Sequence, residues 1–155
     1  MKVSTRGDYA ARALLSLALH GSDRPTSVKE IAERTGLPQP YLEQILLAVK
    51  GAGLVRSKRG VGGGYVLARE PDEINLAEII AAVDGPLTQL LGEHDHCEGH
   101  CVLQEVWVGL SDETRLILER ITLADLVERT RVGHPGAPET AGQGSTRQVD
   151  AVPES

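Results

Sequence analysis

Residues 27–68 read SVKEIAERTGLPQPYLEQILLAVKGAGLVRSKRGVGGGYVLA, and this stretch decides the fold. Ser27 followed three residues later by Glu30 fits a capping box that opens a helix. A short turn around Gly36 comes next. A second helix then begins within Pro38-Gln39-Pro40, because proline is tolerated in the first helical turn. Two short helices around a turn that contains glycine predict a helix-turn-helix.

Two short strands, over 54–58 and 65–68, are predicted directly after the helix-turn-helix. Between them lies a glycine-rich turn over 59–64 with basic residues on its leading edge. A phosphate-binding loop is disfavoured, because the turn lacks the Lys-Ser/Thr pair and no helix follows it. Together with a strong helix pattern over 9–20, this order predicts a winged helix over residues 1–70.

Helices return after the wing. Asn75 can cap a helix over 76–83. Further on, mostly apolar residues recur at spacings of three and four: Leu103, Val106, Trp107, Leu110, Thr114, Ile117, Leu118 and Ile121. This narrow seam predicts a long amphipathic helix that pairs with a second copy, the alternative being packing on its own domain. A last helical turn, capped by Thr122, is predicted over 123–129.

The predicted fold class is therefore mainly α with a small β-wing, a winged helix-turn-helix followed by a long dimerisation helix. We divide the chain into a DNA-binding domain over 1–70 and a region over 71–130 with a sensor loop and dimerisation helices. Residues 131–155 are rich in Gly, Pro, Ser and Thr with few large apolar side chains, so we expect a disordered tail.

The net charge of −6 is distributed unevenly between the two halves of the chain. Residues 1–70 carry 11 Lys and Arg against 6 Asp and Glu, whereas residues 71–155 carry 5 against 16. A basic half joined to an acidic half predicts that the first half meets an anionic polymer. The alternative is a dimeric protein with differently charged solvated faces.

The predicted winged helix presents a set of polar side chains to DNA. The second helix of a helix-turn-helix enters the major groove with its N-terminal half. Glutamine can bond adenine, glutamate can accept from cytosine, and tyrosine can reach a phosphate. The wing cations can neutralise phosphates, or one arginine can enter the minor groove. The predicted DNA contacts are Gln39, Tyr41, Glu43, Gln44, Arg56, Lys58 and Arg59; the alternative is a solvated surface.

Residues 94–101 read HDHCEGHC and hold both cysteines and three of the five histidines. Thiolates suit zinc and iron–sulfur clusters, and imidazoles suit zinc or iron. Four alternatives stay open: a zinc site, an iron–sulfur cluster with mixed ligands, a thiol pair that switches by disulfide formation, and a polar loop. The candidate ligands in this segment are His94, His96, Cys97, His100 and Cys101.

Several classes of protein are disfavoured. No segment approaches the ~20 apolar residues that span a bilayer, and the N-terminus lacks the apolar core of a signal peptide. We therefore expect a cytoplasmic protein without membrane contacts, where close cysteines are more often ligands or redox thiols than a structural disulfide. A metal-dependent enzyme needs a general base beside an open metal site, and the chain offers none.

Several short segments carry a resemblance to a known family: MKVSTRGDYAARA at 1–13, YLEQ at 41–44, GLVRS at 53–57, RGVGGGY at 59–65, AVDG at 82–85 and ITLADLV at 121–127. Over residues 1 to about 130 the chain resembles the iron–sulfur cluster regulator family of bacterial winged-helix repressors. The resemblance implies a homodimer that binds a palindromic site in double-stranded DNA, with a long crossed dimerisation helix. It puts DNA contacts at Tyr41, Glu43, Gln44 and Arg59.

The resemblance also implies a cofactor beside the long helix. Cys97 and Cys101 match the second and third of three cysteines that cluster-binding members carry there, while residues 86–96 contain no cysteine. A histidine of the segment 94–101 can fill the vacant position. In some relatives an acidic residue from the first helix of the partner completes the site, and Asp8 stands at the matching place; the alternative is a charge stabilised by the helix dipole.

The implied cofactor is an iron–sulfur cluster of the two-iron two-sulfur type, which senses redox state, nitric oxide or iron and cluster supply. The alternative is zinc or no cofactor, with control by a thiol switch or a partner protein.

Overall fold

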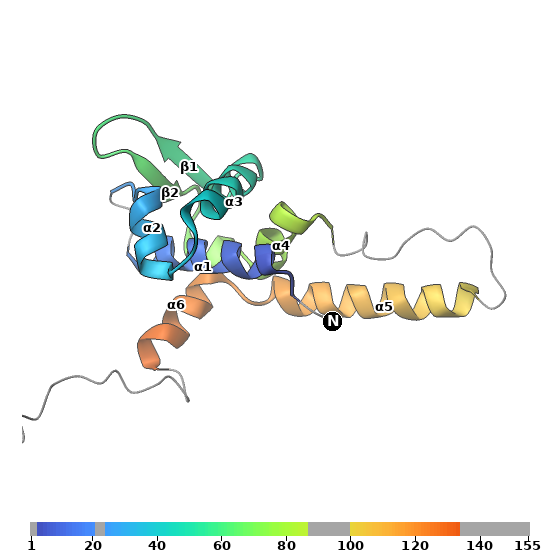
Figure 1. The fold of residues 1–155 in the computed structure, drawn as a ribbon. Helices are drawn as coiled ribbons and strands as arrows, with labels where there is room; N and C mark the ends of the chain where they lie inside the picture. Colours follow the sequence, from blue (N-terminus) through green and yellow to red (C-terminus); the bar gives the residue numbers. More distant parts are fainter. Residues whose placement is uncertain (1–2, 21–23, 87–99, 134–155) are drawn as a thin grey trace, which may run out of the picture.

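The computed structural model describes residues 3–20, 24–86 and 100–133. Within them it contains helices and one two-stranded antiparallel sheet in the predicted order, which confirms a mainly α fold with a small β-wing (Figure 1). The elements are α1 (Thr5–Leu19), α2 (Val28–Thr35), α3 (Gln39–Gly51), β1 (Val55–Lys58), β2 (Gly64–Leu67), the 3-10 helix η1 (Pro71–Glu73), α4 (Leu76–Asp84), α5 (His100–Glu119) and α6 (Leu123–Val132).

The predicted helix-turn-helix is confirmed down to its caps. The Ser27 hydroxyl accepts a hydrogen bond from the Glu30 backbone nitrogen at 3.2 Å, and Ser27 nitrogen donates to Glu30 Oε2 at 2.9 Å. Gly36 ends α2 in the left-handed conformation, with a φ of 69°. A residue with a side chain is strained there, so the glycine allows the sharp turn into α3.

Helix α1 begins earlier than the sequence pattern over 9–20 predicts. Ser4 caps it, because its hydroxyl accepts from the Gly7 backbone nitrogen at 2.8 Å. The same hydroxyl donates to the Asp84 carboxylate in the last turn of α4. One side chain therefore caps the first helix and ties its start to the end of α4.

A single aliphatic core holds the described helices together, apart from most of α5. Leu14 of α1, Leu46 of α3, Ile79 of α4 and Leu123 of α6 are all fully buried in it. The starts of α4 and α6 are also paired through the backbone, since Leu123 nitrogen donates to the Ile74 oxygen at 2.9 Å. Helices α4 and α6 thus pack on the winged helix.

The wing is the hairpin of β1 and β2, and it is also bonded to Thr26, just before α2. β1 and β2 pair with Val55 opposite Leu67 and Lys58 opposite Gly64. Thr26 nitrogen donates to the Tyr65 oxygen at 2.9 Å, and Tyr65 nitrogen donates to the Thr26 oxygen at 2.8 Å. This extra bridge holds the hairpin against the helix-turn-helix.

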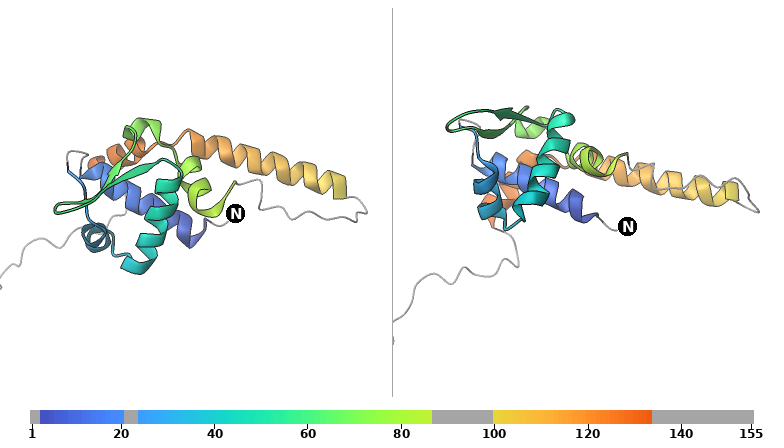
Figure 2. Two further views of the ribbon diagram at one scale, coloured as in Figure 1. Left: turned by 90° about the horizontal axis from the view of Figure 1, so that it is seen from above. Right: turned by 45° about the horizontal axis from the view of Figure 1, so that its top comes forward.

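Helix α5 projects from the rest of the molecule as an arm (Figures 1 and 2). Its 20 residues correspond to about 30 Å of helix. Its residues 102–110 are exposed, whereas partly buried residues appear only from 111 onward, where the helix meets α4. Among the described helices, none has the length and apolar content required to cross a membrane.

Candidate nucleic-acid interface and sensor segment

Helix α3 divides into a buried face and an exposed face. Leu42, Ile45, Leu46 and Val49 are buried against the core. The predicted contacts on this helix all lie exposed: Gln39, Tyr41, Glu43 and Gln44. Side chains with hydrogen-bonding groups therefore extend from the helix that a helix-turn-helix places in the major groove.

Tyr41 is held by an aromatic neighbour. Its ring meets the ring of Tyr9 on α1 edge to face, with centroids 6.4 Å apart and planes at 84°. Tyr9 is partly buried against the core, while Tyr41 is 56% exposed. An edge-to-face pair restricts the tyrosine that lies on the exposed surface.

The wing carries its cations on exposed positions next to α3. Val55 faces the core, whereas Arg56, Lys58 and Arg59 are exposed. Lys50, in the last turn of α3, donates from Nζ to Ser57 Oγ at 2.6 Å. Sequence reasoning missed Lys50, because only its pairing with the wing identifies it as part of this surface.

Helix α3 and the wing, which carry the predicted DNA contacts, lie on one side of the molecule. In Figure 1 the hairpin and α3 lie along the upper side, and the arm α5 runs along the lower side. The hydrogen bond between Lys50 and Ser57 joins the two parts of the upper surface directly. The arrangement combines hydrogen-bonding groups on a helix with cations on a neighbouring hairpin, which are the two components of sequence-specific DNA binding.

The predicted sensor segment, residues 94–101, lies largely outside the described residues. His94, His96 and Cys97 are among the residues left out. His100 and Cys101 belong to the first turn of α5, at the far end of the arm. Across residues 3–20, 24–86 and 102–133, whose side chains the structure describes, no three His, Cys, Asp or Glu side chains are grouped so that they could hold a metal.

Asp8 lies in the first turn of α1, and its carboxylate pairs with Arg12 Nη2 at 2.9 Å. Its side chain is 46% exposed, so it is open to another partner. Helix α1 belongs to the compact body, whereas the first turn of α5 lies at the far end of the arm (Figure 2).

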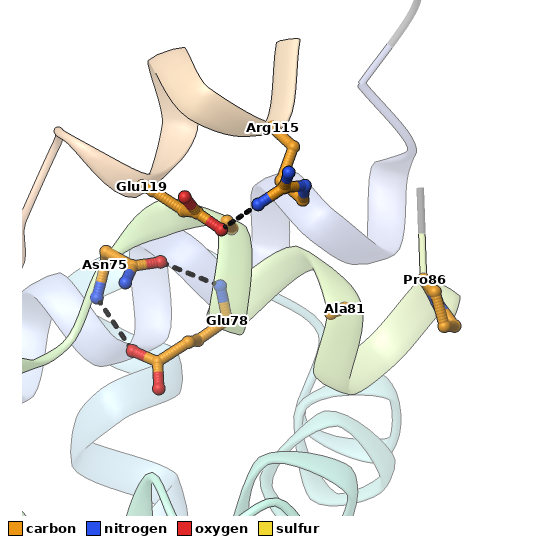
Figure 3. Close-up of a pocket in the computed structure, with 7 residues that line it drawn as sticks. Asn75, Glu78, Ala81, Pro86, Arg115 and Glu119 are labelled. Atoms are coloured by element: carbon orange, nitrogen blue, oxygen red, sulfur yellow. Dashed lines mark hydrogen bonds and ion pairs between the residues drawn. The ribbon is translucent and has the colours of Figure 1, made fainter. Parts of the chain in front are cut away.

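A pocket of about 560 Å³ lies at the root of the arm, between α4 and α5 (Figure 3). Its charged groups are already paired: Arg115 Nη1 donates to Glu119 Oε1 at 2.7 Å, and Glu78 caps α4 together with Asn75. The hydrogen bond to Glu119 raises the pKa of Arg115 above its ordinary value. The remaining lining residues are Ala77, Ala81 and Pro86.

The helix-turn-helix, the wing and their exposed polar side chains define a winged-helix DNA-binding regulator. A family model named Rrf2 and described as an iron-dependent transcriptional regulator matches residues 3–129. The chain belongs to this family, as the sequence resemblance predicted. It is accordingly a transcriptional regulator and not an enzyme.

Curated relatives and solved structures agree with this assignment. The chain is 37% identical over 132 residues to the regulator CymR of Bacillus subtilis, covering 84% of this chain and 92% of CymR. It is 38% identical over 136 residues to the regulator IscR of Photorhabdus laumondii, covering 85% and 82%.

Among structures, the B. subtilis "Global Cysteine Regulator" CymR matches with a TM-score of 0.71 and 37% identity, covering 83% of this chain and 97% of CymR. The structure titled "T. potens IscR" matches with a TM-score of 0.69 and 41% identity, covering 84% and 88%.

Proposed function

We propose that this protein works in the cytoplasm as a homodimeric repressor that binds a palindromic promoter site through α3 and the wing. The observation that carries the proposal is the exposed surface of Gln39, Tyr41, Glu43 and Gln44 beside the wing cations. Each copy supplies one such surface, so a dimer needs two half-sites about one helical turn apart.

The arm supports dimerisation. Leu103, Val106 and Leu110 on one side of α5 are 56%, 56% and 53% exposed, and Trp107 beside them is 46% exposed. A continuous apolar seam of this kind marks an interaction surface. A second copy of α5 fits it, because the same seam is then buried on both chains around a two-fold axis.

The sensor in this proposal is an iron–sulfur cluster held by Cys97 and Cys101. The remaining ligands come from His94, His96 or His100 and from Asp8 of the partner subunit. Two thiolates, imidazoles and a carboxylate are a sufficient donor set for four iron ligands. The exposure of Asp8, and the position of Cys101 at the end of the arm, support a site that two chains share.

A bound cluster supplies a group that reacts with nitric oxide, changes oxidation state, or is lost when iron is scarce. Such a change alters DNA binding only if the cofactor binds one arrangement of the two winged-helix domains more tightly than another. A site that joins α1 of one copy to α5 of the other meets this condition, because the cofactor then links the two chains.

A second candidate is a regulator without a cluster, controlled by a thiol switch, a partner protein or zinc. The chain has only two cysteines, four residues apart. The related regulator CymR of Staphylococcus aureus, 34% identical, is described in an oxidised form. Cys97 and Cys101 in this candidate form a reversible disulfide or bind zinc.

One experiment separates the candidates. The protein is purified without oxygen, and its visible absorption spectrum, iron, sulfide and zinc are measured on one sample. Visible absorption with equal iron and sulfide supports the cluster. A colourless protein with stoichiometric zinc supports a zinc site, and a colourless protein without metal supports the thiol switch or control by a partner.

We expect Cys97→Ser to lose the bound cofactor and to remain a dimer, because the seam of α5 does not include Cys97. His20→Ala, at the end of α1, is the control and should keep both cofactor and dimer. Full cofactor content in Cys97→Ser would remove this residue from the ligand set.

A further inference from the structure

Helix α3 exposes one large aliphatic side chain among its polar residues. Leu47 is 63% exposed, whereas Leu42, Ile45, Leu46 and Val49 are buried at 0–1%. An exposed leucine keeps its apolar surface in water and therefore contributes no free energy of burial. Its place on the helix that reads DNA therefore raises the question of what covers it.

Leu47 is surrounded along the helix by residues of the proposed DNA surface. Glu43 and Gln44 precede it by four and three residues, and Lys50 follows it by three. Residues at these spacings are neighbours on a helix surface. Lys50 itself bonds to Ser57 of the wing at 2.6 Å. Leu47 thus lies between the groups proposed to read bases and the cations proposed to bind phosphates.

The major groove offers one apolar group at a base edge, the C5 methyl of thymine. A leucine side chain has no hydrogen-bonding group, so it cannot recognise a phosphate, a sugar hydroxyl or the polar edge of a base. An apolar side chain such as leucine can, however, make a van der Waals contact with a methyl group. A protein partner is a poorer fit, because a single leucine within a polar surface does not form an apolar patch.

We propose that Leu47 is a specificity-determining residue that contacts the C5 methyl of a thymine in each half-site. This inference rests on the proposed function, in which α3 lies in the major groove. The operator therefore has a thymine whose methyl group is read by a van der Waals contact, in addition to bases read by hydrogen bonds.

The test begins with the full-length dimer and a pool of randomised duplexes, from which a tight-binding palindrome is selected. Each thymine of the palindrome is then replaced by deoxyuridine, in both half-sites together, which removes the methyl group and leaves every hydrogen-bonding group in place. Dissociation constants are measured for the wild type and for Leu47→Ala.

At one thymine we expect the wild type to bind the uracil duplex more weakly, by about fourfold for each methyl group that is removed from the interface. Leu47→Ala should bind the thymine and uracil duplexes equally well at that position. Val132→Ala is the matched control, because Val132 is an exposed apolar residue, 80% exposed, at the far end of α6. It should keep the methyl preference of the wild type.

Alanine at position 47 preserves the helix, because alanine is the best helix former. Failure of the wild type to select any duplex would overturn the proposed function. A selected palindrome without any methyl preference, or with a preference that Leu47→Ala retains in full, would overturn the role of Leu47 alone.

Discussion

The head of the molecule buries most of its large apolar side chains, whereas its arm exposes most of its own. In the head, formed by α1 to α4, the wing and α6, side chains such as Leu14, Leu46 and Ile79 are 0% exposed. Along the arm α5, Leu103 and Leu110 remain more than half exposed. The head is complete within one chain, whereas the arm leaves unburied a surface that a second chain can cover.

The largest effect is expected from a charge on the seam of the arm. Leu110→Glu would bury an uncompensated carboxylate in each copy at the interface, at a cost of several kcal/mol. We expect dimerisation to weaken by at least about 100-fold, while circular dichroism shows a folded head. The mass in solution, measured by light scattering, reports the change.

Glu105→Lys is the control for this prediction, because Glu105 lies on the opposite side of α5 from the seam. It changes a charge on the arm and should leave the dimer intact. If Leu110→Glu kept the mass of the wild type, the seam would not be the dimer contact.

The next effect concerns the stability of the head. Gly64 has a φ of 153°, and a Cβ at this position would collide with the backbone oxygen of Thr26. Gly64→Ala should therefore lower the free energy of unfolding by about 2 kcal/mol, as measured in urea, by disturbing the bridge between the wing and α2.

Gly51→Ala is the matched substitution, because no atom lies within 4 Å of a Cβ placed there. Its helical position should make it neutral or stabilising, by up to about 1 kcal/mol. Equal stabilities of Gly64→Ala and Gly51→Ala would show that the close approach at the wing is unimportant.

A smaller effect is expected at the wing cations. Arg59→Ala should weaken DNA binding and reduce the slope of log K against log salt concentration by about 1 for each phosphate that the arginine neutralises. Arg129→Ala, on α6, removes an arginine away from the proposed surface and should leave the slope unchanged. An unaltered slope in Arg59→Ala would count against a phosphate contact by the wing.

The smallest effect concerns pH. The backbone hydrogen bond from Ser27, joined by its side-chain hydrogen bond, lowers the pKa of Glu30 below its ordinary value. Because the pKa of Glu30 is lower in the folded state, its carboxylate stabilises the head at pH values above the ordinary pKa of a glutamate, about 4.3. That stability is lost as the pH falls through the lower value.

Glu30→Gln should therefore be less stable than the wild type at pH 7, with the difference shrinking in acid unfolding experiments towards pH 3. Glu33→Gln, one turn away on α2 with a pairing to Lys29 at 3.9 Å, tests whether loss of any carboxylate has the same effect. A difference between Glu30→Gln and the wild type that did not change with pH would contradict the capping role.

Local sequence signals predict most of the head. The predicted capping box at Ser27 and the predicted caps at Asn75 and Thr122 are confirmed, because these bonds join residues close in sequence. The bridge between Thr26 and Tyr65 and the bond between Ser4 and Asp84 were not predicted. They join residues far apart in sequence through groups that leave no periodic pattern.

The candidate sites differ in how far they are tested. The structure exposes the predicted side chains of α3 and the wing, but their contacts with DNA stay predictions. The division of the chain at residues 70 and 130 also stays a prediction. The proposed ligand set also stays a prediction, because His94, His96 and Cys97 lie outside the described residues.

Sedimentation equilibrium of the full chain, alone and with a selected palindromic duplex, tests most directly whether the protein is a dimer that reads two half-sites. We predict a mass of twice the 16.6 kDa chain at micromolar concentration, and two chains on each duplex. A monomer under these conditions, or a single chain bound to the whole palindrome, would contradict this mode of binding.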